Sequence, residues 1–175
     1  MLRRTSLTPR SARRSRFGAP RRGLPSLERL FAYDAWANAE SLKSVRDAGA
    51  PAAAVRLMAH IAAAGQLWKG RLDADAEKVV VWPDWTVDEC EGRLQRLAAR
   101  WKEQVADLTT SDGARPVLYV NSKGESWTTS VDDILAHVLL HSSYHRGQVA
   151  YILRASGSTP PYTDYVHCIR SGLVE

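Results

Sequence analysis

Residues 137–148, HVLLHSSYHRGQ, carry the strongest signal in this 175-residue chain for both its fold and its chemistry. Three histidines, His137, His141 and His145, stand four residues apart, which is close to one turn of an α-helix. At about 100° per residue, His141 and His145 fall among the valines and isoleucines of the apolar face, and His137 falls at its edge. The stretch therefore predicts a helix that turns two imidazoles toward the protein interior and leaves a third at the border.

Capping and breaking residues set the limits of this helix and of three others. Ser130 can cap the histidine helix, which we expect to reach about Ser156, with Gly157 as its C-terminal cap. The third upstream helix begins with TVDE, which matches a capping box. Apolar residues at spacings of three and four predict the upstream helices over residues 26–48, 52–74 and 86–108.

Between the third helix and the histidine helix the pattern changes. Residues 117–129, VLYVNSKGESWTT, form two β-prone runs around a turn that contains glycine, which is typical of a β-hairpin. One more short helix is expected within residues 162–173. The sequence therefore predicts an all-α fold, a four-helix bundle with a short β-hairpin before the last long helix.

The N-terminal segment, residues 1–25, differs from the rest in composition. Eight of the 24 Lys and Arg residues lie in residues 1–24 with no acidic residue, which leaves 16 basic residues against 19 acidic ones. We expect residues 1–25 to be a disordered Arg-rich tail and residues 26–175 to be one slightly acidic domain, which argues against nucleic-acid binding by the domain itself. Three interpretations of the tail stay open: a segment without function, a basic arm that binds nucleic acid or acidic lipid, and an organelle transit peptide.

Cysteine content and hydropathy bear on the compartment. The chain has two cysteines, too few for a disulfide framework, and reduced thiols are typical of an intracellular protein. No apolar run approaches the roughly 20 residues of a membrane span. We therefore expect a cytoplasmic protein with no membrane partner.

A further histidine, His60, lies on the apolar face of the second helix. One inward histidine is usually a hydrogen-bonded core residue, but three from two helices would be costly to bury without partners. A divalent metal uses the neutral nitrogen lone pairs of all three, and a three-histidine set leaves coordination positions open for water or substrate. The motif HSSYH lacks the glutamate of the zincins, because Ser142 follows the first histidine. The candidate metal ligands are His60, His141 and His145, with Zn²⁺ or Ni²⁺ as the expected ion.

Four other polar residues are candidates for contact with the site. Gln148 falls on the side of His141 and can orient a ligand ring through a hydrogen bond. Asn38 is an amide that needs partners if it is buried. Tyr144 and His137 border the histidine face, where Tyr144 can meet substrate or a dimer partner.

Three neighbouring positions invite competing interpretations. Gly147 in mid-helix is either a tolerated loss or a point of close approach by another chain segment. Arg146 is expected to face outward or to form an ion pair. Asp34 is interpreted mainly as a solvated charge, with an acid near the metal as the alternative.

Three stretches together resemble the DinB-like (DinB/YfiT) family: AYDAWAN at residues 32–38, HIAAAGQLW at 60–68, and HVLLHSSYHRGQ. The resemblance covers about residues 27–164. It implies a four-helix bundle, often a homodimer, in which His60, His141 and His145 hold a divalent metal.

The resemblance also implies a range of functions, because relatives include metal-dependent hydrolases and S-transferases that use a low-molecular-weight thiol. The expected function is that of a divalent-metal-binding protein acting on a small-molecule substrate as a hydrolase or thiol-dependent S-transferase, the latter with a thiol as second cofactor. The alternative is a non-catalytic, stress-linked dimeric binding protein with a structural metal.

Overall fold

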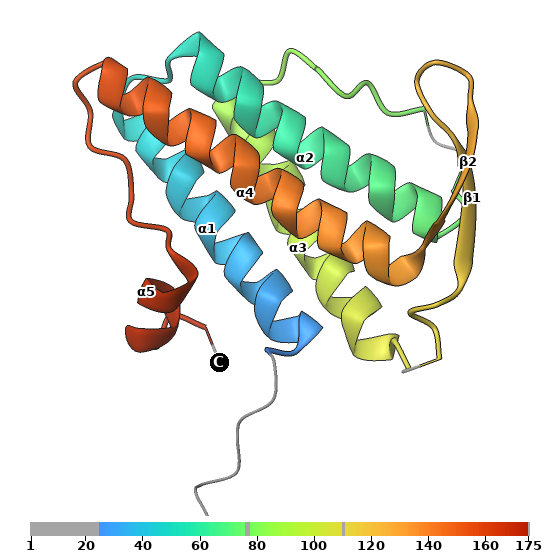
Figure 1. Cartoon of the computed structure of the whole chain (residues 1–175). Helices are drawn as coiled ribbons and strands as arrows, with labels where there is room; N and C mark the ends of the chain where they lie inside the picture. Colours follow the sequence, from blue (N-terminus) through green and yellow to red (C-terminus); the bar gives the residue numbers. More distant parts are fainter. Residues whose placement is uncertain (1–24, 76–77, 110, 175) are drawn as a thin grey trace, which may run out of the picture.

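Four long helices dominate the computed structural model, which describes residues 25–75, 78–109 and 111–174 (Figure 1). Three of them start at a side chain that satisfies a free backbone amide. Ser26 accepts a hydrogen bond from the amide of Arg29, Ser130 accepts one from Asp133, and Thr86 forms the expected capping box with Glu89. The helices are α1 (Leu27–Asp47), α2 (Ala52–Leu72), α3 (Val87–Asp107) and α4 (Val131–Ala155).

The helix ends agree with the sequence prediction to within a residue, except at α2. That helix ends at Leu72, two residues early, and Ala74 then adopts a φ of 57° in the left-handed region. Gly157, with a φ of 81°, follows α4 where the C-terminal cap was predicted. Except for Pro25, the predicted Arg-rich tail lies outside the described residues.

The predicted hairpin is confirmed, with β1 (Pro116–Val120) antiparallel to β2 (Ser126–Ser130). Its turn is held by Asn121, whose Oδ1 accepts hydrogen bonds from the amides of Lys123 and Glu125 at 2.9 and 3.0 Å. Gly124 supplies the positive φ of 81° that this turn requires. Because β2 ends on Ser130, the residue that caps α4, the hairpin runs directly into the histidine helix.

The helices pack so that α1 and α2 each contact both α3 and α4. A short helix, α5 (Tyr165–Arg170), follows α4 and lies beside α1 (Figure 1). The Tyr33 hydroxyl ties this segment to α1 by donating to the carbonyl of Thr163 at 2.8 Å. The fold is the all-α bundle with a small hairpin that the sequence predicts. Among the described residues, the helices are all too short or too polar to cross a membrane.

The interior of the bundle consists of two apolar clusters. One includes Val45, Met58 and Leu153, and the other includes Trp101 and Ile134. Along α1 and α4, the residues between these clusters are polar and buried: Asp34, Asn38, Ser41, Ser142, His145 and Arg146. A polar layer therefore crosses the middle of the bundle, and the histidines belong to it.

Candidate metal centre

The structure brings His60, His141 and His145 together at one point between α2 and α4. His141 lies in the middle, with its Nε2 3.2 Å from the Nε2 of His60 and 3.2 Å from the Nε2 of His145. The three candidate ligand atoms all lie within 4.8 Å of one another. His60 reaches this point because α2 packs against α4, and the other two reach it because they lie one helical turn apart.

Hydrogen bonds at Nδ1 determine which ring nitrogen of His60 and of His145 carries the proton. The Nδ1 of His60 lies 2.6 Å from the carbonyl oxygen of Val81, and the Nδ1 of His145 lies 2.8 Å from the Oε1 of Gln148. Both acceptors require an N–H at Nδ1, so both Nε2 atoms present lone pairs toward His141. His141 can donate at most one proton to two such lone pairs, whereas a cation at this point satisfies all three nitrogens. The donor set therefore fits a metal ion.

The surroundings of His60 and His141 favour the neutral form of these two imidazoles. Burial, together with the neighbouring histidines, lowers the pKa of His141 from 6.5 to about 4. Burial also lowers the pKa of His60, against the opposing effect of its hydrogen bond to Val81. Neutral imidazole is the form that binds a metal, so the folded chain presents His60 and His141 in their binding form at neutral pH.

Each histidine of the cluster packs against a different ring. Trp82, from the segment between α2 and α3, stacks on His60 with ring centroids 3.7 Å apart. Tyr144 packs edge-on against His145 at 5.1 Å. His137 lies 5.5 Å from His141 and is exposed, which agrees with its predicted place at the edge of the apolar face.

Two partners of His60, Val81 and Trp82, are not among the candidates predicted from the sequence. Val81 acts through its backbone carbonyl, which no residue type reveals. Trp82 lies between the second and third helices, and its place over His60 depends on the path of that linker. A tryptophan next to a proline in a segment without helical periodicity was the one available signal.

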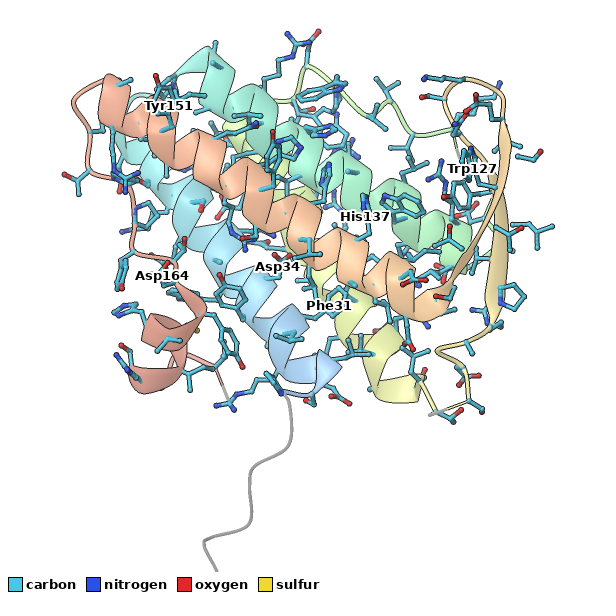
Figure 2. All side chains as sticks on the ribbon, viewed as in Figure 1. Phe31, Asp34, Trp127, His137, Tyr151 and Asp164 are labelled. Atoms are coloured by element: carbon cyan, nitrogen blue, oxygen red, sulfur yellow. The ribbon has the colours of Figure 1, made fainter. Side chains whose placement is uncertain are left out.

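The remaining candidate, Asn38, belongs to a second cluster on the α1 side of α4. Its Nδ2 donates to Asp34 at 2.9 Å, and its Oδ1 accepts from Ser142 at 3.0 Å and from Arg146 at 2.9 Å. Arg146 also donates to the carboxylate of Asp34 and, at 2.7 Å, to Ser142. Figure 2 shows Asp34 between α1 and α4.

These contacts decide between the two alternatives for Arg146 and correct the interpretation of Asp34. Arg146 is 5% exposed and forms an ion pair inside the bundle, which confirms the ion-pair alternative and not the outward-facing one. Asp34, interpreted mainly as a solvated charge, is 8% exposed. Arg146 is buried because α1 packs against the side of α4 that carries it.

The structure does not support the interpretation of Gly147 as a point of close approach. A Cβ added there would meet no atom of the described residues within 4 Å, apart from the backbone of its own helix. Among the described residues, therefore, no segment approaches Gly147 closely. Gly65 of α2 does serve a close approach, because a Cβ there would lie 2.5 Å from Leu97 of α3.

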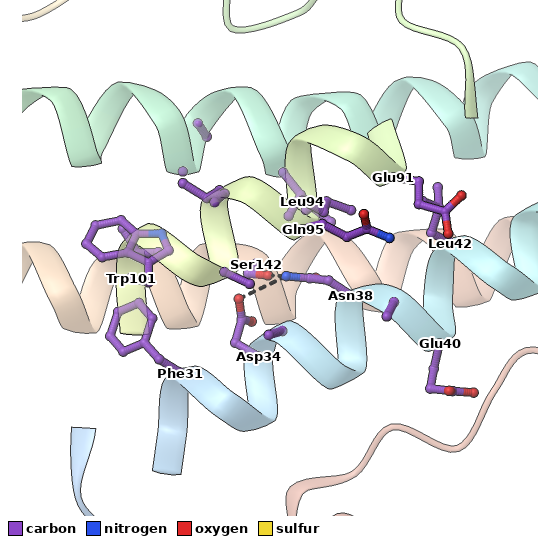
Figure 3. Close-up of a pocket in the computed structure, with 18 of the residues that line it drawn as sticks. Phe31, Asp34, Asn38, Glu40, Leu42, Glu91, Leu94, Gln95, Trp101 and Ser142 are labelled. Carbon is purple, nitrogen blue, oxygen red and sulfur yellow. Dashed lines mark hydrogen bonds between the residues drawn. The ribbon is translucent and has the colours of Figure 1, made fainter. Parts of the chain in front are cut away.

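A cavity of about 350 Å³ lies between the four long helices and is lined in part by His141 (Figure 3). Small side chains in its wall leave the space open: Ala35, Ala39, Ala64, Gly65 and Ala98. Asn38 and Ser142 of the second polar cluster also line it. The histidine cluster and the second polar cluster therefore border one internal space.

The architecture and the histidine cluster together define a helical-bundle protein whose interior could hold a metal ion. The sequence profile of the DinB family matches residues 36–172, so the chain belongs to the DinB family. Protein DinB of Bacillus subtilis (strain 168) is 31% identical over 85 residues, which is 45% of this chain and 45% of that protein. The match therefore spans less than half of the relative's length. No solved structure matches the chain.

Proposed function

We propose that this chain is a divalent-metal-binding enzyme that acts on a small molecule, as a hydrolase or a thiol-dependent S-transferase. The observation that supports the proposal is the convergence of three Nε2 atoms at a point where His141 also lines a cavity. A metal with a purely structural role needs no such space, whereas a substrate does. Imidazole nitrogens suit Zn²⁺ and Ni²⁺ among the common divalent ions.

In this proposal His60, His141 and His145 hold the metal, which supplies a Lewis acid for activation of a water, a thiol or a carbonyl group. The chain provides the geometry. Val81 and Gln148 hold two of the rings with their lone pairs inward. The cavity offers space for the substrate beside His141. For the transferase, a low-molecular-weight thiol is the second cofactor.

Metal content tests the first part of the proposal. Wild-type protein, His60→Ala and His141→Ala are loaded with Zn²⁺ or Ni²⁺, dialysed and measured by elemental analysis. His167→Ala is the matched control, because His167 lies in α5, away from the cluster. We expect about one equivalent of metal in the wild type and the control and a large loss in the other two. Equal metal content in all four proteins would refute the site.

Activity tests the second part. Metal-loaded and metal-free proteins are assayed with p-nitrophenyl acetate for hydrolysis, and with 1-chloro-2,4-dinitrobenzene plus cysteine or glutathione for thiol transfer. Turnover that requires the metal and is lost in His141→Ala supports an enzyme of the corresponding class. Bound metal without metal-dependent turnover in either assay favours the alternative described next.

The alternative is a non-catalytic, stress-linked dimeric binding protein with a structural metal. One observation favours dimer formation in either case. Leu140, Tyr144 and Tyr151 are 71%, 66% and 72% exposed and fall within about 40° of one another on α4. An exposed apolar stripe on a helix is typical of an interaction surface. We propose that it joins two copies of this chain.

Sedimentation equilibrium tests the homodimer. Tyr151→Glu places a charge in the stripe, and Leu118→Glu places one on the hairpin at a residue that is 77% exposed. We expect the wild type and Leu118→Glu to be dimeric and Tyr151→Glu to be monomeric. A monomeric wild type, or three proteins with one mass, would contradict the role of the stripe.

A further inference from the structure

The wall of the cavity contains a buried hydrogen-bond donor to which the described residues offer no acceptor. Trp101 of α3 is 4% exposed and packs against Phe31 with ring centroids 5.0 Å apart. Its Nε1 is buried and has no hydrogen-bond partner among the described residues. An indole N–H can only donate, and a buried donor without an acceptor is costly. The missing acceptor therefore points to a molecule that is not part of the chain.

The position of Trp101 tells where that molecule would lie. Trp101 and Phe31 stand at one end of the cavity, and Leu42 and Glu91 stand at the other (Figure 3). Most of the lining between them is aliphatic or aromatic. A ligand that fills this space is therefore mainly apolar, with a polar atom near the Trp101 end.

The charged groups nearest the interior of the cavity are compensated within the chain, whereas Lys43, at its edge, pairs with Asp47 and Glu40 is directed away from the other labelled residues (Figure 3). The Asp34 carboxylate is taken by Arg146 and Asn38. Near the opposite end, Arg46 pairs with Glu91 at 2.9 Å and also with Asp88. A charged ligand would find no free counter-charge at these groups, so its burial would be unfavourable.

We propose that this cavity binds an uncharged, mainly apolar small molecule through a hydrogen-bond acceptor, such as a carbonyl or ether oxygen, that meets the indole N–H of Trp101. Because His141 lines the same cavity, the molecule shares this space with a member of the histidine cluster. The identification of this molecule as the substrate rests on the proposed function. Its binding in the cavity is independent of that function, because neither Trp101 nor the apolar wall requires a metal.

A pair of nearly isosteric probes tests the acceptor. Acetophenone carries a carbonyl oxygen where α-methylstyrene carries a methylene group. Each is titrated into the full-length, metal-free protein labelled with ¹⁵N, and the indole N–H signals of the six tryptophans are followed by NMR. The signal that disappears in Trp101→Phe identifies Trp101. We expect acetophenone to shift the Trp101 signal and to bind roughly three- to tenfold more tightly than α-methylstyrene, the value of one hydrogen bond.

Two alanines of α3 provide a matched test of the location. Ala98 lines the cavity and Ala99 is an exposed neighbour, so Ala98→Leu fills the cavity and Ala99→Leu adds the same atoms outside it. We expect Ala98→Leu to weaken acetophenone binding at least tenfold and Ala99→Leu to leave it unchanged. Trp101→Phe keeps an aromatic ring and should remove the preference for acetophenone over α-methylstyrene.

Several results would overturn the inference: an unmoved Trp101 signal, equal binding of the two probes by the wild type, or unchanged acetophenone binding in Ala98→Leu. If Trp101→Phe does not fold, the proposal is still tested by the binding of the two probes to the wild type and by the comparison of Ala98→Leu with Ala99→Leu. Metal content of the same protein batch is measured separately. Acetophenone binding at Trp101 in a protein that holds no metal would support the cavity site while refuting the metal centre.

Discussion

The buried ion pair between Asp34 and Arg146 allows a quantitative prediction about stability. In Asp34→Ala the guanidinium of Arg146, which is 5% exposed, keeps its hydrogen bonds to Asn38 and Ser142 but loses its counter-charge. Asn38 loses the acceptor for its Nδ2 in the same step. Leaving one partner of a buried pair uncompensated costs about 3–5 kcal/mol. That is a large part of the about 5–15 kcal/mol that stabilises a typical domain.

Urea denaturation followed by tryptophan fluorescence measures this loss. With a slope of about 2 kcal/mol per molar urea, a loss of about 4 kcal/mol lowers the midpoint by roughly 2 M. Asp88→Ala is the control, because it removes the carboxylate from another Asp–Arg pair, whose Asp side chain is 82% exposed. Exposed pairs contribute little, so the control should lie close to the wild type.

The double variant Asp34→Leu/Arg146→Met separates the charge from the packing. It removes both charges together and should regain most of the stability that Asp34→Ala loses, because apolar replacements of a buried pair are often neutral. The coupling between the two sites then appears as strong non-additivity in a double-mutant cycle. An Asp34→Ala midpoint no lower than that of Asp88→Ala would refute the uncompensated-charge explanation.

Three further predictions concern the histidine helix. Gln148→Ala removes the hydrogen-bond acceptor of His145 and should weaken zinc binding about tenfold or more in calorimetric titration. Gln148→Glu keeps an acceptor and should retain the zinc affinity. Equal affinities of Gln148→Ala and the wild type would contradict the hydrogen-bond role. Gly147→Ala should raise the free energy of unfolding by about 1 kcal/mol in urea denaturation, because the added methyl group meets open space; a loss would reveal a contact from another molecule. The metal-free protein should lose stability as pH falls from 6.5 toward 4, because the unfolded chain protonates His141 first while the folded chain holds the pKa of His141 at about 4. His141→Gln should flatten this pH dependence of stability between pH 7 and pH 5. An unchanged slope would count against the role of His141.

The features that the sequence predicts well depend on local interactions. The helix caps at Ser26, Thr86 and Ser130 are short-range, and so is the turn at Gly124. The angles of His141 and His145 on their helix follow from helical geometry alone. His60 could be assigned to the same site through its place on the apolar face of α2 and through the family resemblance, because its distance in sequence from α4 carries no information.

What the sequence does not reveal depends on which helices are neighbours. Arg146 has a definite angle on α4, but its burial depends on α1 lying on that side. The cavity arises where small residues of several helices coincide, and no single helix shows it. Trp101, at a core spacing on α3, looks like an ordinary packing residue until its Nε1 is found without an acceptor. Such features become visible only when the whole bundle is assembled.

Both polar clusters include side chains of α4, so the Asp34–Arg146 ion pair and the histidine cluster are linked through this helix. His141 bonds toward α2, whereas Ser142, the next residue, bonds to Asn38 of α1. Side-chain atoms lie about 5–6 Å from a helix axis, so a rotation of α4 by about 20° would move the ring nitrogens by about 2 Å. Metal–ligand distances must fall within roughly 0.2 Å of their usual values, so this displacement would disrupt the site. The contacts of α1 with α4 oppose that rotation. Asp34→Ala should therefore weaken zinc binding even though the hydrogen bonds of Asp34 go to Arg146 and Asn38, and Asp88→Ala should not. Unchanged zinc affinity in folded Asp34→Ala would show that the packing of α2 alone sets the direction of the histidines.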